Sequence, residues 1–296
     1  MVGDSHCAAP TRYFGRFPYD RRRQNPRIPV SDKSSMTLKD ELVAVARQAG
    51  AVILDIYNRD FETLRKADRS PVTVADTAAE AVILEALARL APDVPAIAEE
   101  QCAKDGVPPA AAKRFFLVDP LDGTKEFIKG TGEFTVNIAL VSGAEPVLGV
   151  VHVPVTGVTY WGRQGAGAFM ARADGAPVAI HTRPAPMERL VIVASKDHAG
   201  PQVEAMLKRL PTASTANLGS SLKFCLVAEG KADFYPRLAP TCEWDTGAAQ
   251  CVLEAAGGGV TDTEGRRLAY NKAELTNPSF LAFGDPRQDW RALLGP

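Results

Sequence analysis

Two acidic clusters, each at the end of an apolar run, constrain this chain more than any other feature. Glu99 and Glu100 end one run, and Asp119 and Asp122 end a second run about twenty residues later. Short apolar runs bounded by turn residues are typical of buried strands, so we expect both clusters at strand ends. Carboxylates that lie together away from water repel one another unless cations neutralise them. Oxygen ligands suit a hard divalent cation, so the pattern predicts a Mg²⁺ site.

The segment 119–122 and the residues after it favour a tight turn. Pro120 fixes its own φ and is expected to end the strand. Both carboxylates can then face one point, and the carbonyl group of Leu121 can join them. Gly123 permits a close approach of the backbone. Thr124 places a hydroxyl beside the cluster, where it could hold a water molecule.

Two further acids, Asp76 and Asp245, lie at expected helix starts. Asp76 could simply cap its helix, and Asp245 could simply complement a helix dipole. In the same way, Glu99 and Glu100 could form a solvated loop pair. Each alternative is reasonable for one residue alone, but acids that gather at strand and helix ends favour a metal site.

Composition excludes several classes of protein. The 296 residues carry a net charge of −1, which gives no basic field for specific nucleic-acid binding. No apolar run reaches the roughly 18 residues of a membrane span, and no signal-peptide core is present. The five scattered cysteines lack a Cys-x-x-Cys pair, which argues against disulfides and zinc and favours a cytoplasmic protein. Four dispersed histidines are too few for a histidine metal site, and His152 is expected in a strand.

Residues 1–36 are rich in arginine and proline and show no helical or strand period. We expect a poorly ordered basic arm. The alternative is an arm that contacts anionic lipid or RNA, so association with the inner face of a membrane stays open.

Residues 37–296 are expected to form one domain that mixes helices and strands, with halves at about 37–185 and 186–296. Thr37 and Asp40 resemble a capping box at the start of the first helix. Apolar periodicity and Gly or Pro punctuation predict helices at 38–56, between Asp76 and Pro92 with Ile83, Leu87 and Leu90 on one face, and at 201–210, 221–229 and 245–256. Strands are predicted at 134–141, 147–153, 158–170 with an internal turn, 190–195, 233–237 and 279–284.

The motifs together resemble the inositol monophosphatase superfamily of Mg²⁺-dependent, lithium-sensitive phosphatases. The resemblance rests on the segments 98–100, 119–124 and 244–249. Further segments are typical of its bacterial 3′(2′),5′-bisphosphate nucleotidase branch, namely 66–73, 125–129, 132–137 and 219–224. The match covers about residues 38–284. It implies a layered αβαβα sandwich of the inositol monophosphatase and fructose-bisphosphatase type, a mixed α/β and α+β fold.

The resemblance also implies the roles of the clustered residues. Two or three Mg²⁺ ions would be held by Glu99, Asp119, the Leu121 carbonyl, Asp122 and Asp245. Thr124, with Asp76 or Glu100, would position and activate the attacking water. In-line attack by this water would release inorganic phosphate without a phosphoenzyme.

The second half of the chain would recognise the substrate. Residues 219–221 would open a helix whose backbone N–H groups bind a phosphate. The residues expected to contact substrate are Gly123, Thr124, Ser195, His198, Ser220, Lys223 and Arg237. Lys223 and Arg237 would face the 5′-phosphate, and Ser195 and His198 would line the nucleoside pocket. Alternatively, Ser220 is only a helix cap and Lys223 is only a surface lysine.

The reaction implied is removal of the 3′-phosphate from adenosine 3′,5′-bisphosphate, and also from its 3′-phosphosulfate form. The partner is thus a small nucleotide bisphosphate, and oligomeric state stays open. One alternative is an inositol monophosphatase or a broad sugar-phosphate phosphatase. Residues 125–127 argue against it, because they read Lys-Glu-Phe where the inositol enzymes usually have Thr-Asn-Phe. A second alternative, a metal-binding regulatory or RNA-associated protein, is supported only by the basic arm.

Overall fold

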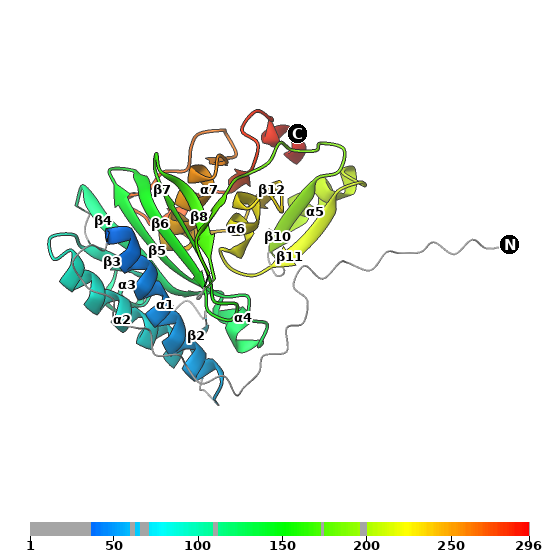
Figure 1. The fold of residues 1–296 in the computed structure, drawn as a ribbon. Helices are drawn as coiled ribbons and strands as arrows, with labels where there is room; N and C mark the ends of the chain where they lie inside the picture. Colours follow the sequence, from blue (N-terminus) through cyan, green and yellow to red (C-terminus); the bar gives the residue numbers. More distant parts are fainter. Residues whose placement is uncertain are drawn as a thin grey trace.

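Helices and sheets alternate in five layers in the computed structural model (Figure 1). The structure describes residues 37–59, 63–65, 71–108, 112–172, 175–195 and 200–295. The expected basic arm at 1–36 lies outside the described residues, as do positions 66–70 of the recognised motifs. No helix within the described ranges is long and apolar enough to cross a bilayer.

Two helices form the first layer, α1 (Leu38–Tyr57) and α2 (Val74–Leu90). Each begins with a capping box, Thr37 with Asp40 and Thr73 with Asp76, so the predicted cap at Thr37 is confirmed. Their apolar faces pack on one face of a large sheet, in a core that includes Leu42, Ile53, Ile83, Val136 and Ile138.

That large sheet is the second layer and has seven strands in chain order. Its strands are β3 (Ala96–Ala98), β4 (Arg114–Asp122), β5 (Thr135–Ser142), β6 (Glu145–Val153), β7 (Val158–Arg163), β8 (Gly167–Ala171) and β9 (Val178–Ile180). Only the β3–β4 pair is parallel. Seven of the eight residues of β5 are buried, because helices cover both faces of the sheet.

Two helices of the third layer, α6 (Leu222–Ala228) and α7 (Glu243–Ala255), lie between the two main sheets (Figure 1). The α7 backbone approaches the large sheet closely at Gly149 and Gly162. A Cβ atom at Gly149 would lie 2.2 Å from the carbonyl oxygen of Ala248, and one at Gly162 would lie 2.7 Å from the Cα of Val252. These two glycines therefore allow the close approach of α7, which carries Asp245.

The fourth layer is a five-stranded sheet that α5 (Gly200–Arg209) and the 3₁₀ helix η1 (Trp290–Leu294) cover on its outer face. Its strand order is β11 (Ser214–Leu218), β10 (Val191–Ser195), β12 (Phe234–Arg237), β16 (Phe280–Phe283) and β14 (Gly259–Asp262). The remaining short elements are β1 (Thr63–Arg65), β2 (Pro71–Thr73), α3 (Glu99–Asp105), α4 (Thr124–Ile128), β13 (Thr241–Cys242) and β15 (Thr276–Asn277). The predicted layered αβαβα fold is confirmed.

Two local predictions were wrong in detail. Pro120 does not end its strand: the ladder between β4 and β5 shifts register after Asp119 and resumes where Asp122 pairs with Thr135. A proline cannot donate to the ladder, so it interrupts the pairing without terminating the strand. Helix α7 begins at Glu243, two residues before the predicted start. Helices α3 and α4 were not predicted, because five to seven residues are too few to establish a helical period.

Candidate active site

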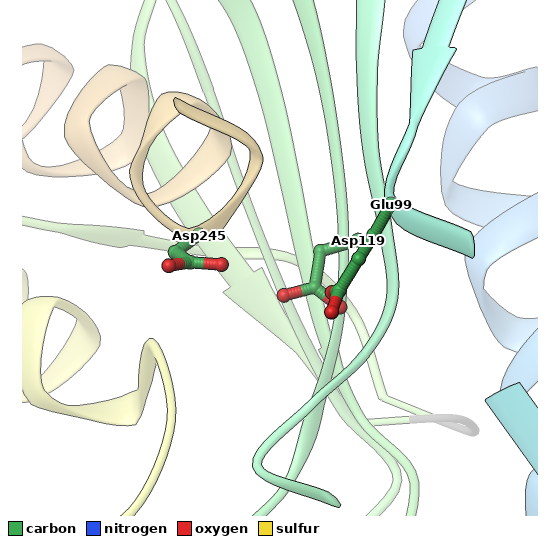
Figure 2. Close-up of side chains that lie close together, drawn as sticks. All are labelled: Glu99, Asp119 and Asp245. Atoms are coloured by element: carbon green, nitrogen blue, oxygen red, sulfur yellow. The ribbon is translucent and has the colours of Figure 1, made fainter. Parts of the chain in front are cut away.

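Three of the predicted acidic ligands converge on one point (Figure 2). Glu99 is the first residue of α3, Asp119 lies on β4, and Asp245 lies in the first turn of α7. One carboxylate oxygen from each residue lies within 4.8 Å of the other two. The short helix α3, the large sheet and the central helix α7 thus meet at this cluster, which could hold a metal ion.

The electrostatics of the cluster favour a cation. Asp119 is 1% exposed. Burial, together with the carboxylates of Asp122 and Glu99, raises the pKa of Asp245 well above its usual value, against the stabilising N–H of Cys242. A divalent cation would relieve this repulsion, and a donor set made only of oxygens is the set that Mg²⁺ prefers. The residues present therefore fit the metal that the sequence predicts.

The fourth predicted acidic ligand, Asp122, lines the adjoining cavity but is not one of the three converging residues. Its Oδ2 accepts hydrogen bonds from the N–H of Ser221 at 2.6 Å, the hydroxyl of Ser221 at 2.8 Å and the amide of Asn137 at 3.3 Å. The backbone of Leu121 lies between the acids, since its N–H donates to Asp119 at 3.0 Å. Its carbonyl oxygen lies 3.4 Å from the Thr124 hydroxyl.

Thr124 was expected to act with Asp76 or Glu100, and in the structure it contacts Asp76. The hydroxyl of Thr124 donates to Oδ1 of Asp76 at 3.1 Å. Oδ2 of the same buried carboxylate accepts from the N–H and the hydroxyl of Thr73, both at 2.7 Å. Glu100, the other expected partner, is 9% exposed, and its N–H donates to Oε2 of Glu80 at 2.8 Å. Glu80 thereby holds the start of α3, which carries Glu99.

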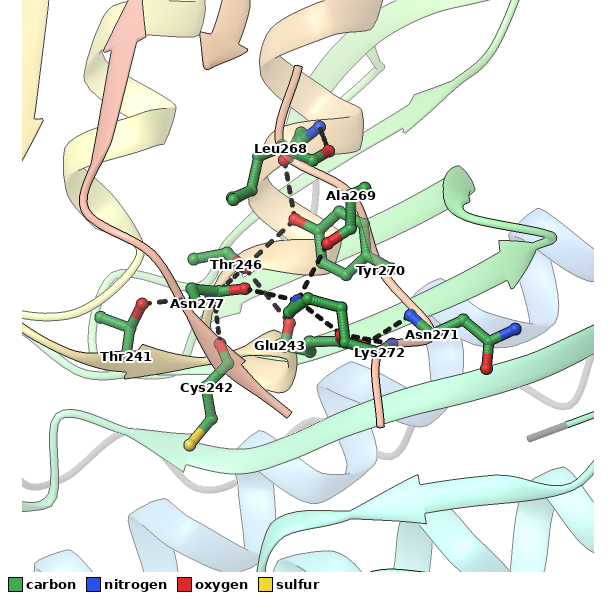
Figure 3. Close-up of polar contacts among 11 residues, drawn as sticks. Thr241, Cys242, Glu243, Thr246, Leu268, Ala269, Tyr270, Asn271, Lys272 and Asn277 are labelled. Carbon is green, nitrogen blue, oxygen red and sulfur yellow. Dashed lines mark hydrogen bonds and ion pairs between the residues drawn. The ribbon is translucent and has the colours of Figure 1, made fainter. Parts of the chain in front are cut away.

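A buried polar network holds the start of α7 (Figure 3). Glu243 is fully buried and accepts hydrogen bonds from the N–H groups of Asn271 and Lys272 and from the ammonium group of Lys272. The amide of Asn277 donates to the hydroxyls of Thr241 and Thr246 and to the carbonyl of Cys242. Because Asp245 lies within this turn, the network determines where its carboxylate points.

A cavity of about 450 Å³ adjoins the acidic cluster. Its walls include Glu99, Asp122 and Asp245 on the acidic side, together with the cationic Lys223 and Arg237. The volume lies in the range of ordinary small-molecule sites. A cavity with both carboxylates and basic side chains can accommodate a cation together with an anionic ligand.

Gly123 and Gly219 shape the wall where the two halves of the chain meet. Gly123 has φ +97, and a Cβ there would lie 3.1 Å from the carbonyl oxygen of Glu133. A Cβ at Gly219 would lie 2.4 Å from the side chain of Glu126. The close approach expected at Gly123 is therefore confirmed, and Gly219 adds a second such point.

The segment 219–221 differs from its predicted role. Helix α6 begins at Leu222 with Ser221 as its cap, and Ser220 adopts the left-handed conformation with φ 50. The N–H of Gly219 donates to Glu133 at 3.0 Å, and the N–H of Ser221 donates to Asp122. The prediction of unoccupied N–H groups along this segment is therefore wrong at those two positions, because carboxylates of the large-sheet half already accept from them.

Lys223 is not a surface lysine. It is 4% exposed, and its Nζ donates to the carbonyl oxygens of Ser220 at 2.6 Å and Leu218 at 3.3 Å. Burial lowers the pKa of Lys223 to about 8, although nearby carboxylates, foremost Asp122, raise it. Arg237 also lines the cavity and donates to the carbonyl groups of Ala239 and Pro240.

The remaining predicted positions are only partly described. The backbone of Ser195 ends β10 beside Leu218, whereas its side chain and all of His198 lie outside the described residues. His152 is a buried residue of β6, as predicted, and burial lowers its pKa to about 3. The four cysteines within the described ranges form no disulfide.

Sequence reasoning did not identify Glu80 and Asn137 as site residues, and it gave Ser221 only a backbone N–H in the segment 219–221. Asn137 is a polar interruption of the predicted strand 134–141, and that interruption was the available indication. Glu80 lies within an ordinary helical pattern. Nothing local marks it, because its partner is the backbone of Glu100.

Comparison with known proteins shows the family. Residues 35–290 match the inositol monophosphatase family, and the chain belongs to it. Among curated relatives, the 3′(2′),5′-bisphosphate nucleotidase CysQ of Escherichia coli K12 is 44% identical over 249 residues, which cover 81% of this chain and 97% of that protein. CysQ of Haemophilus influenzae is 34% identical, over 86% of this chain and 96% of its own length.

Solved structures agree with this assignment. CysQ from Bacteroides thetaiotaomicron has a TM-score of 0.69 at 36% identity and covers 84% of this chain and 99% of its own. An inositol monophosphatase from Thermotoga maritima has a TM-score of 0.71 at 27% identity and covers 86% and 95% respectively.

Proposed function

We propose that this chain is a Mg²⁺-dependent phosphomonoester hydrolase that converts adenosine 3′,5′-bisphosphate to AMP and inorganic phosphate. It would also act on the 3′-phosphosulfate form. The observation that carries the proposal is the 44% identity to the CysQ nucleotidase of E. coli over nearly the whole of that protein. The acidic cluster and the basic cavity wall supply the chemistry that this reaction needs.

The metal site would use Glu99, Asp119, Asp122, Asp245 and the carbonyl oxygen of Leu121. This set offers enough oxygen ligands for two or three Mg²⁺ ions, since carboxylates can bridge neighbouring ions. Bound Mg²⁺ would neutralise the charge of the scissile phosphate and of the leaving oxygen. The chain's own contribution is to hold these oxygens in place before substrate arrives.

Thr124 and Asp76 would orient the attacking water, with Glu100 beside the cluster. The Thr124 hydroxyl donates its proton to Oδ1 of Asp76. The lone pairs of its oxygen are then available to accept a hydrogen bond from water. Oδ2 of Asp76 is held by Thr73, so the carboxylate cannot rotate away. The threonine can therefore hold a water in a fixed direction relative to the bound phosphate.

The basic wall would bind the phosphate that is not hydrolysed. Lys223 has three N–H groups and gives two of them to carbonyl oxygens, and its ammonium lies 5.3 Å from the centroid of the Tyr235 ring. The third N–H would turn from the ring toward a bound phosphate. Arg237 and the hydroxyl of Ser220 line the same cavity. Gly123 and Thr124 would face the reacting phosphate, and Ser195 and His198 would contact the nucleoside. A cytoplasmic location and a partner that is a small nucleotide, without specific nucleic-acid binding, complete the proposal.

A phosphate-release panel with Mg²⁺ tests this function. The substrates are adenosine 3′,5′-bisphosphate, 3′-AMP, inositol 1-phosphate and fructose 1,6-bisphosphate. The expected result is the highest kcat/KM for the bisphosphate, loss of activity with chelator, and inhibition by Li⁺ as the family resemblance implies. Faster hydrolysis of inositol 1-phosphate would favour the alternative that the Thermotoga inositol monophosphatase represents. No release from any substrate would favour the regulatory alternative.

A further inference from the structure

Three hydrogen-bond donors converge on a single oxygen of Asp122. Oδ2 accepts from the N–H of Ser221, the hydroxyl of Ser221 and Nδ2 of Asn137. A carboxylate oxygen has room for about two or three such donors, so Oδ2 is saturated. Within the described part of the chain, no hydrogen bond reaches Oδ1. The carboxylate is therefore fixed in one orientation, with one oxygen held by the protein and the other available for a cation.

The position of Asn137 follows from the pleat of β5. Alternate side chains of this strand share a face, and Val141 and Ala139 on that face pack in the core that contains α6 and α7. Asn137 is the next residue on the same face, one step closer to the acidic cluster. Its strand register places it directly opposite Asp119. A polar residue at the end of an apolar face therefore lies between the metal ligands and α6.

The amide nitrogen of Asn137 faces two acceptors, whereas its amide oxygen is left without a hydrogen bond. Nδ2 donates to Oδ2 of Asp122 at 3.3 Å and to the hydroxyl of Ser221 at 3.0 Å. The amide oxygen of Asn137 is buried and has no hydrogen-bond partner among the described residues. Rotating the amide would bring that oxygen against the Asp122 carboxylate. An unsatisfied buried oxygen is costly, so this orientation indicates a functional constraint at Asp122.

Ser221 joins three elements at this point. Its hydroxyl accepts from Asn137 on β5 and lies 2.8 Å both from Oδ2 of Asp122 on β4 and from the carbonyl oxygen of Asp245 on α7. Ser221 is 2% exposed and precedes α6, between Ser220 and Lys223. It therefore connects the segment that carries the basic cavity wall with two of the acids that would hold metal.

We propose that Ser221, held by Asn137, is a positioning residue that keeps the Asp122 carboxylate turned with Oδ1 toward the cation. This inference rests on the proposed function, because it takes Asp122 as a metal ligand. Partners of this kind orient a ligand without touching the metal, and their loss typically lowers metal affinity by about 10- to 100-fold.

The test is Mn²⁺ binding to the folded protein without substrate. Electron paramagnetic resonance measures the unbound ion and so gives the dissociation constant. Ser221→Ala should bind Mn²⁺ about 10-fold more weakly than the unmutated chain. Its phosphatase rate should fall more at limiting Mg²⁺ than at saturating Mg²⁺, because the substitution alters ligand orientation rather than ligand identity. The concentration of Mg²⁺ for half-maximal activity should rise by the same factor as the Mn²⁺ dissociation constant.

Thr135→Val is the matched control. Thr135 lies on the same strand and face as Asn137 and is fully buried, and its hydroxyl has no partner among the described residues. Valine is nearly isosteric, so this variant removes a buried hydroxyl without removing a hydrogen bond. Its Mn²⁺ affinity should equal that of the wild type. An equal loss in Thr135→Val and Ser221→Ala would overturn the proposal in favour of a general packing effect.

A double-mutant cycle tests whether Asn137 acts through Ser221. Asn137→Ala should weaken Mn²⁺ binding by about 3- to 10-fold. The double variant should lose less than the product of the two single losses, because both act on the same carboxylate. A simple product would show that Asn137 acts independently, which contradicts the proposal.

The outcomes separate this inference from the proposed function. Wild-type Mn²⁺ affinity in Ser221→Ala would overturn the positioning role, while phosphatase activity that still depends on Mg²⁺ would leave the proposed function intact. If the unmutated chain bound no divalent cation, both would fail.

Discussion

Asp76 uses its two carboxylate oxygens for two different purposes. Oδ2 caps α2 through Thr73, and Oδ1 accepts the hydroxyl of Thr124 beside the acidic cluster. From the sequence, the cap and the site role are competing explanations of this residue. In the structure the two are compatible, because a carboxylate offers two separate oxygens, and the cap fixes the direction of the oxygen that faces Thr124.

At the same scale, Asp122→Asn should lower kcat by several orders of magnitude. Replacing the carboxylate with a neutral carboxamide removes a negative charge that would hold the metal. The bound metal would supply several kcal/mol of transition-state stabilisation. The amide would also turn an N–H toward the donors of Ser221. Phosphate release at saturating Mg²⁺ checks this, with circular dichroism to confirm folding.

The matched control for that variant is Asp289→Asn, since the Asp289 side chain is 60% exposed and pairs with Arg291 at the surface. It should retain full turnover. Turnover near wild type in a folded Asp122→Asn protein would contradict a catalytic metal site at this residue.

Lys223 should set the preference for a second phosphate. Lys223→Met keeps the apolar stem in its buried position but removes the charge. A charge-assisted phosphate contact contributes about 1.5–3 kcal/mol, so the preference for adenosine 3′,5′-bisphosphate over 3′-AMP should fall by roughly 10- to 150-fold. The ratio of kcat/KM for adenosine 3′,5′-bisphosphate to kcat/KM for 3′-AMP measures this preference. An equal slowing of both substrates would contradict a contact between Lys223 and the second phosphate. Lys208→Met on α5 is the control and should change neither kcat/KM value.

The same preference should depend on pH in a definite direction. Because the pKa of Lys223 is lowered to about 8, the side chain is charged at pH 7 and becomes neutral as the pH rises through that value. The ratio of kcat/KM for the bisphosphate to kcat/KM for 3′-AMP should therefore fall above about pH 8. Taking the ratio cancels titrations that affect both substrates alike. In Lys223→Met the ratio should be flat across this range.

At the scale of elements, α7 owes its position to buried contacts at its first turn and along its length. Gly149 and Gly162 let its backbone approach the sheet, and Glu243 ties its N-terminus to the segment around Lys272. The ion pair is strongly asymmetric, since the Glu243 side chain is fully buried and that of Lys272 is 29% exposed. Breaking such a pair leaves a buried charge with fewer partners.

Lys272→Met should therefore lower the free energy of unfolding by about 3–5 kcal/mol, the usual cost of removing one partner of a buried pair. Urea denaturation measures the change. Arg59→Met is the comparison, because Arg59 and Asp55 form an exposed pair with side chains 68% and 59% accessible, and should cost less than about 1 kcal/mol. Equal losses in the two variants would show that the Glu243 network does not stabilise α7.

At the scale of the whole molecule, the acidic cluster joins elements that are far apart in the chain. Glu99 comes directly after β3 and Asp119 comes from β4 in the large sheet, and Asp245 comes from the central helix α7. A cation bound among them would link α3, the large sheet and α7. Binding to the folded state alone would therefore stabilise the entire fold rather than one loop.

Mg²⁺ should accordingly raise the melting temperature. At a concentration 100 times its dissociation constant, a ligand adds about 2.7 kcal/mol of stability. For a chain of this size that corresponds to a shift of roughly 5–10 °C, at about 2–4 °C per kcal/mol. Thermal melts at matched ionic strength measure the shift, and Asp245→Asn should abolish most of it. A rise of the same size with NaCl alone would point to general screening instead.

Much of the fold was predictable because its determinants are local. The capping box at Thr37, the apolar runs of β5 and β6 and the acidic residues after apolar runs depend on neighbours a few positions away. The family motifs at 98–100, 119–124 and 244–249 are also continuous in the sequence. Short elements such as α3 and α4 were not predictable, since their few residues form helices through tertiary contacts rather than through periodicity.

The sequence by itself determined the mixture of helices and strands and the acids that would hold metal, because apolar periodicity and carboxylate chemistry belong to the residues themselves. The layered class of fold was implied by the resemblance of its motifs to the family. Only the tertiary structure decided what holds each acid in place. Ser221 reaches Asp122 across 99 positions of sequence, and Asn137 meets Ser221 across 84. Lys223 could be read as a surface residue until its burial was seen. Hydrogen bonds between distant segments leave no local pattern, since their geometry exists only once sheets and helices have packed.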